Sequence, residues 1–185
     1  LHIIPPSVAT QPLLPMADLL PYLQQKHAEW QQAYAHVYHN SDQDDFVSFE
    51  GEAENGQLIV GIIDSTLLAW PHKPSHPWML TLHIAYDGNG LNGMPSKQVY
   101  QHMEAFEDAV MAELPEHEGY LNLGRETGDG VRLVYIAGKQ FVQATRVLER
   151  LMPRFAQDMS IEYDLFQDKY WQSLQRFEHM GTEAD

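Results

Sequence analysis

The chain has 185 residues, with 11 lysines and arginines against 26 aspartates and glutamates, ten histidines and no cysteine. The formal net charge of −15 argues against nucleic acids and anionic membranes as partners, because both attract clustered basic residues. It favours a basic protein as any macromolecular partner. The missing cysteine excludes disulfides, thiolate chemistry and cysteine-type zinc sites within this sequence, and it fits a cytoplasmic location.

The first segment predicts an extended arm over residues 1–16, because it holds four prolines and no basic residue. It lacks the charged start and the unbroken apolar run of a signal peptide. Residues 17–39 then predict a helix, with Asp18 placed to cap its start. One apolar stripe at helical spacing contains Leu19, Leu23, Trp30, Tyr34 and Val37.

Residues 46–54 and 57–65 predict two strands joined by Asn55-Gly56, the dipeptide typical of a tight hairpin. Residues 70–77 contain three prolines and predict a loop, which is the best candidate for an internal boundary. The expected organisation is therefore an arm (1–16), a helix-plus-hairpin extension (17–77), a main domain (78–178) and a tail (179–185).

The main domain begins with an alternating strand over residues 78–86 and a helix over residues 96–114. The core stripe expected on this helix contains Val99, Met103, Phe106, Val110 and Leu114. A second hairpin follows, with strands 120–127 and 131–137, and then a helix over residues 139–152 with Phe141, Thr145, Leu148 and Met152 expected on its buried face. A strand around residues 161–165 and a closing helix over residues 168–177 end the domain.

This order of elements predicts an α+β fold of the ferredoxin-like type, a split β-α-β sandwich (β-α-β-β-α-β) with an N-terminal helix and an extra β-hairpin. Two helices are expected to cover one face of an antiparallel sheet and to leave the other face open. The N-terminal helix and the first hairpin either extend this sheet or cover its open face; the sequence leaves both arrangements open.

A set of short motifs in the second half occurs in a characteristic order. Phe106-Glu107-Asp108 lies on a helix, Thr127-x-x-Gly130-x-Arg132 spans a hairpin, and Asp168-x-x-Trp171 lies near the end. In this order and spacing the chain resembles domain-of-unknown-function family 695 (DUF695). The resemblance implies an architecture but no settled activity. Similar domains in some bacterial proteins are fused to one resembling the acidic inhibitor of ribonuclease E, which implies a regulatory, protein-binding role.

The candidate ligand-binding residues are Arg132, Thr127, Arg125, His83, Glu162 and Glu107. In the structural interpretation, Thr127 and the glycines make a tight turn, and Arg132 pairs with a carboxylate such as Glu107 or Glu162. In the functional interpretation, Arg132 clamps an anion, because a guanidinium presents a rigid fork of donors. The structural interpretation is favoured. His83 is expected on the open face of the sheet.

The sequence predicts no metal site, no cofactor and no catalytic residue. His36 and His39 are three apart on the expected helix, but they project from its polar side and have no evident further ligand. The phosphate-binding glycine loops, dinucleotide fingerprint and serine-nucleophile motif are missing from the sequence. An enzyme is therefore the less favoured alternative.

The leading hypothesis is a non-enzymatic, acidic binding or regulatory domain that engages a basic protein. Six acids on the helix at residues 96–114 and just beyond it would form the docking surface: Glu104, Glu107, Asp108, Glu113, Glu116 and Glu118. The alternative is a small-molecule binder or enzyme that uses the open sheet face around Arg132 to hold a carboxylate or phosphate. The sequence does not predict an oligomeric state.

Overall fold

The computed structural model describes residues 15–157 and 159–177. The chain divides into two compact units, residues 1–37 and residues 38–185. The boundary expected at residues 70–77 therefore falls inside the second unit. Most of the expected arm and all of the expected tail lie outside the described residues. Among the helices that the structure describes, none is both long and apolar enough to cross a membrane.

The first unit contains helix α1 (Met16–Tyr34). The helix was expected to start at an Asp18 cap and to continue to residue 39, and both expectations are wrong. Asp18 lies in the first turn, where its negative charge favours the helix N-terminus, and the cap position is taken by Pro15 without a side-chain hydrogen bond. Trp30 contacts the rings of His27 and Tyr34 within the same helix.

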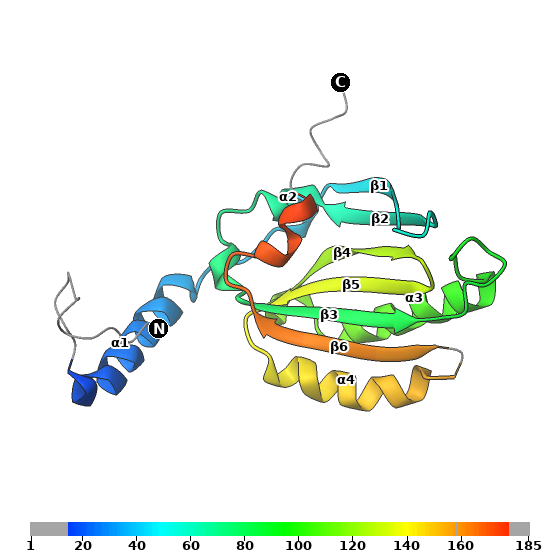
Figure 1. Ribbon diagram of the computed structural model, residues 1–185. Helices are drawn as coiled ribbons and strands as arrows, with labels where there is room; N and C mark the ends of the chain where they lie inside the picture. Colours follow the sequence, from blue (N-terminus) through cyan, green and yellow to red (C-terminus); the bar gives the residue numbers. More distant parts are fainter. Residues whose placement is uncertain (1–14, 158, 178–185) are drawn as a thin grey trace, which may run out of the picture. The chain divides into compact units, whose positions relative to one another are not determined.

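The second unit contains a six-stranded antiparallel sheet (Figure 1). Its strands are β1 (Phe46–Glu52), β2 (Leu58–Asp64), β3 (Trp78–Ala85), β4 (Tyr120–Gly128), β5 (Val131–Gly138) and β6 (Ser160–Gln167). Its helices are α2 (Ser65–Leu68), α3 (Lys97–Glu113) and α4 (Val142–Phe155), with the short 3-10 turns η2 (Ser41–Gln43), η3 (Lys73–Ser75), η4 (Glu116–Glu118) and η5 (Gln172–Phe177). The strand order is β1-β2-β4-β5-β3-β6.

The mixed α+β class is confirmed by this open antiparallel sheet with its helices. The first hairpin forms around Asn55-Gly56 as expected, and it extends the sheet, because β2 pairs with β4. The hairpin therefore belongs to the same folding unit as the strands that follow it.

Helices α3 and α4 cover one face of the sheet, where the larger core lies (Figure 1). The expected stripe of α3 is buried through Met103, Phe106 and Val110. The buried face expected for α4 is confirmed in part, since Leu148 is buried and the partly buried Met152 packs against the core. The other buried residues are Ala144, Val147 and Leu151, so the buried face lies part of a turn away from the expected one. The helix starts only at Val142, and the Phe141 ring packs on Trp78 outside the helix. It also continues through Pro153 to Phe155, one turn further than expected.

The opposite face of the sheet was expected to be open, but a second core covers much of it. Leu67 and Leu68 from α2 pack there with Trp171, and with Leu174 and Phe177 of η5. The Trp171 indole nitrogen donates to the His76 carbonyl oxygen at 2.9 Å, which fastens the closing segment to the proline-rich loop. These segments are short, so sequence periodicity gives little sign of their burial.

A β-bulge in strand β4 determines which side chains face α3. The pairing of β4 with β5 shifts between Asn122 and Gly124, so Leu123 is an extra residue in β4. Leu121 and Leu123 both belong to the second core, whereas Arg125 points to the α3 side and contacts Glu107. The bulge thus turns Arg125 toward the helix.

Candidate functional site

The Arg132 side chain is the centre of a buried polar cluster on the α3 side of the sheet. Only 1% of Arg132 is exposed. Its Nε donates to the Thr127 hydroxyl oxygen at 2.8 Å, and its Nη1 donates to Glu107 Oε1 at 2.6 Å. Thr127 and Arg132 are direct cross-strand partners in the β4–β5 hairpin. This pairing explains the Thr-x-x-Gly-x-Arg spacing physically. The hydrogen bond to Glu107 gives Arg132 one of the two carboxylate partners expected for it.

A second guanidinium shares the same carboxylate. Arg125 Nη1 donates to Glu107 Oε2 at 2.8 Å, and its Nη2 lies 3.6 Å from Glu104 Oε1. Burial alone would lower the pKa of Arg125, but the negative charge of Glu107 and its hydrogen bond outweigh burial and raise that pKa above its ordinary value. Arg125 and Arg132 thus share one buried carboxylate, with one hydrogen bond from each guanidinium to Glu107.

Three residues of the cluster line a pocket of about 450 Å³. The lining contains Arg125, Arg132 and Thr127 from the β4–β5 hairpin. The other lining residues come from the β1–β2 hairpin and from the start of α3 with the segment before it: Ser48, Phe49, Glu50, Val60, Gly61, Ile62, Met94 and Tyr100. The Tyr100 ring lies 4.7 Å from the Arg132 guanidinium carbon, in a cation–π contact. The volume falls within the range of roughly 300–1,000 Å³ that is typical of small-molecule sites.

The expected site residues do not all lie together. His83 pairs with Leu133 in β5 and with Glu162 in β6, and Leu133 packs against the second core. Because strand side chains alternate, His83 and Glu162 share that face and Arg132 points to the other. The expectation of one site on the open face around Arg132, with His83 and Glu162, is therefore wrong. His83 Nε2 instead lies 3.2 Å from the Asp164 carboxylate.

The sequence did not reveal the hairpin wall of the pocket or the role of Tyr100. The hairpin was expected in a separate extension, and nothing in its residues indicated that β2 pairs with β4. Tyr100 lies one position beyond the apolar stripe of α3, which is a weak signal for a contact with a buried arginine.

The acids expected to form a docking surface are used in different ways. Glu107 is buried in the arginine cluster, and Glu113 pairs with Arg150 of α4. Glu118 accepts a hydrogen bond from Gln143, while Asp108 is exposed. Part of the negative charge of α3 is therefore neutralised inside the second unit.

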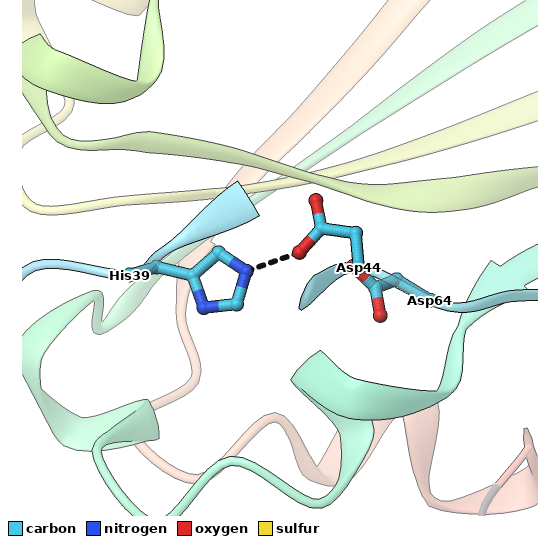
Figure 2. A group of neighbouring side chains, drawn as sticks. All are labelled: His39, Asp44 and Asp64. Atoms are coloured by element: carbon cyan, nitrogen blue, oxygen red, sulfur yellow. Dashed lines mark hydrogen bonds and ion pairs between the residues drawn. The ribbon is translucent and has the colours of Figure 1, made fainter. Parts of the chain in front are cut away.

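A further group of potential ligands lies away from the pocket. Since α1 ends at Tyr34, His36 and His39 do not share a helix as expected. His39 lies instead beside Asp44 and Asp64, with one ligand atom of each residue within 4.8 Å of the others (Figure 2). Sequence reasoning missed this group, because its members come from three segments whose proximity depends on the fold.

Comparison with known proteins identifies one family. No curated protein and no solved structure matches the chain. A family of unknown function, DUF695, matches residues 51–177, which include the pocket-lining strand β2, helix α3 and the whole β4–β5 hairpin. The match covers more than half of the sequence, and it contains the three motifs described above. The chain therefore belongs to the DUF695 family.

Proposed function

We propose that the protein binds a small anionic molecule, one that carries a carboxylate or phosphate group, in the pocket beside Arg125 and Arg132. The observation that carries the proposal is the sharing of one buried carboxylate by two guanidiniums that both line a pocket of about 450 Å³. A ligand anion would compete for Arg125 with Glu104, whose Oε1 lies 3.6 Å from Arg125 Nη2, while Glu107 stays bound to both guanidiniums.

The chemistry of the lining supports an anion with an apolar or aromatic body. The side chain of Arg125 is 28% exposed, so it can reorient toward a ligand while Arg132 stays fixed. The Thr127 oxygen accepts from Arg132, and its own hydroxyl hydrogen can be donated to the ligand. Val60, Ile62 and Met94 supply apolar surface for the rest of the molecule.

The test is a titration of the full chain with benzoate, phenyl phosphate and inorganic phosphate, followed by amide NMR shifts and calorimetry. We expect shifts in β2, β4 and α3, and we expect Arg125→Gln to weaken binding by about 10- to 100-fold, the value of a charge-assisted hydrogen bond. Arg146→Gln, which removes an exposed arginine of α4, is the matched control and should leave the affinity unchanged. An unchanged affinity in Arg125→Gln, or shifts outside the pocket only, would contradict the proposal.

The basic-protein partner remains a second proposal, in which the exposed acids steer a regulatory contact. The internal pairing of Glu107 and Glu113 leaves it less support than the pocket has. The cysteine-free composition supports the cytoplasm as the compartment of either activity.

We also propose a ferredoxin-like plan for strands β3 to β6 with α3 and α4. The support is the local strand order β4-β5-β3-β6, with each helix connecting two strands that flank a third. In this plan the β1–β2 hairpin is an addition at the β4 edge, and it supplies one wall of the pocket.

A further inference from the structure

A cluster of one histidine and two aspartates lies where the first hairpin ends (Figure 2). Asp44 follows η2 and precedes β1, and Asp64 is the last residue of β2. His39 comes from the segment before η2. The backbone holds the two acidic segments together, because the Ser65 nitrogen donates to the Asp45 carbonyl oxygen at 2.9 Å.

Asp64 is the most informative member of the cluster. Its side chain is fully buried, at 0% exposure. One carboxylate oxygen, Oδ1, caps α2 by accepting from the Thr66 and Leu67 backbone nitrogens at 2.9 and 3.2 Å. The other oxygen, Oδ2, has no hydrogen-bond partner among the residues that the structure describes. A buried carboxylate oxygen without a donor is costly, so this atom points to a missing partner.

The other two members are also held in place. Asp44 pairs with the Nε2 atom of His39, and their side chains are only 20% and 8% exposed. The His39 ring packs edge-on against Trp70, with ring centroids 5.6 Å apart. Burial raises the pKa of the Asp44 carboxyl; the hydrogen bond from His39 opposes this rise, and the negative charge of Asp64 adds to it. Two carboxylates that face each other in a buried place favour a cation between them.

We propose that His39, Asp44 and Asp64 bind one divalent transition-metal ion, with Zn²⁺ as the best fit. The donor set is one imidazole nitrogen and two carboxylate oxygens, whereas Mg²⁺ and Ca²⁺ prefer oxygen donors alone. Three protein ligands leave a fourth tetrahedral position on Zn²⁺ for water or an exchangeable ligand. His39 also lines a separate pocket of about 320 Å³.

The ion would connect the segment before β1 to the end of β2, because its ligands flank the β1–β2 hairpin. This site is separate from the arginine pocket, whose lining contains none of the three ligands. The metal proposal can therefore fail while the anion proposal succeeds, and the reverse is equally possible.

The test is calorimetric titration of the EDTA-stripped full chain with Zn²⁺, Mg²⁺ and Ca²⁺. We expect one saturable Zn²⁺ site per chain, with Mg²⁺ and Ca²⁺ at least about tenfold weaker. Asp64→Asn should weaken Zn²⁺ binding at least about tenfold. The asparagine keeps an oxygen that can cap α2, so this variant removes the ligand charge with little change in the helix cap.

Two matched controls address the nine other histidines and the surrounding acids. Asp42→Asn removes an exposed acid from η2, and His36→Gln removes an exposed histidine; neither should change the Zn²⁺ affinity. His39→Gln should weaken it as Asp64→Asn does. In histidine NMR spectra, the His39 imidazole signals should shift when Zn²⁺ is added.

Two results would overturn the proposal. One is equal Zn²⁺ affinity in wild type, Asp64→Asn and His39→Gln, which would assign any binding to surface histidines. The other is the absence of saturable Zn²⁺ binding to the stripped wild-type chain, whatever the stability of the Asp64→Asn variant.

Discussion

At the scale of single residues, the stability of the site depends on the partners of one buried guanidinium. Arg132 is 1% exposed, so each of its N–H groups has lost water and needs an acceptor within the protein. Glu107 supplies a charged acceptor and Thr127 a neutral one. Removing one partner leaves a buried charged donor unmatched, which costs more than the hydrogen bond itself contributes.

We therefore expect Thr127→Val to lower the free energy of unfolding by about 1–3 kcal/mol, because valine keeps the shape but lacks the acceptor for Arg132 Nε. Urea unfolding followed by circular dichroism measures this change. The matched control is Thr145→Val, which removes an exposed hydroxyl bonded to the Phe141 carbonyl oxygen on α4. Equal effects of the two substitutions would contradict the role assigned to Thr127.

At the scale of elements, register and bulges decide which residues meet. Strand β4 pairs with β2 on one side and β5 on the other, and its bulge turns Arg125 to the α3 side. Gly124 makes the bulge possible, with φ +135°, a conformation that L side chains rarely adopt. A Cβ atom at this position would lie 2.3 Å from the Ile62 carbonyl oxygen in β2.

Gly124→Ala should accordingly lower the free energy of unfolding by roughly 2–4 kcal/mol, through backbone strain and a weakened β2–β4 pairing. Amide hydrogen exchange should become faster in β2, and urea unfolding gives the size of the effect. Gly51→Ala is the control, because a Cβ atom there would meet no atom within 4 Å. A fully stable Gly124→Ala variant with unchanged exchange in β2 would contradict this account of the bulge.

The elements differ in how well their sequences predict them. The stripe of α3 is regular, and its buried residues Met103, Phe106 and Val110 were predicted. In α4, Phe141 and Met152 also fit a helical stripe, but Phe141 packs on Trp78 before the helix starts, so the buried face rotates to Val147 and Leu151. The spacing of apolar residues shows that a segment is an amphipathic helix. Tertiary contacts decide which of two neighbouring faces of that helix is buried.

The candidate site, too, was predicted from the sequence only in part. Glu107 was predicted as a partner of Arg132. Thr127 is close to Arg132 in the sequence, because only a two-residue turn separates strands β4 and β5. The side of the sheet on which Arg132 lies was not predicted, because it follows from the register between distant strands. For the same reason, no spacing rule could bring Asp44 and Asp64 together with His39.

At the scale of the whole molecule, the net charge of −15 counts the ten histidines as neutral, so acid pH changes the charge strongly. His76 differs from a surface histidine, because only 2% of it is exposed. Burial is the main reason that the pKa of His76 falls from 6.5 to about 3, and the positive charges of Lys139 and His39 lower it further. The folded protein therefore keeps this imidazole neutral where the unfolded chain protonates it.

This difference predicts a loss of stability as the pH falls. Between pH 6.5 and about 3 the unfolded chain binds a proton at His76 that the folded chain does not, so the free energy of unfolding decreases toward acid. The slope from this one group approaches about 1.4 kcal/mol per pH unit, and above pH 6.5 the contribution no longer changes.

Urea unfolding from pH 7.5 to 5 measures how the free energy of unfolding depends on pH. EDTA is present so that no metal ion is bound at His39. His76→Gln should be less stable than wild type at neutral pH, yet its free energy of unfolding should change less steeply with pH. Parallel curves for wild type and His76→Gln would show that this imidazole does not govern the acid sensitivity of the fold.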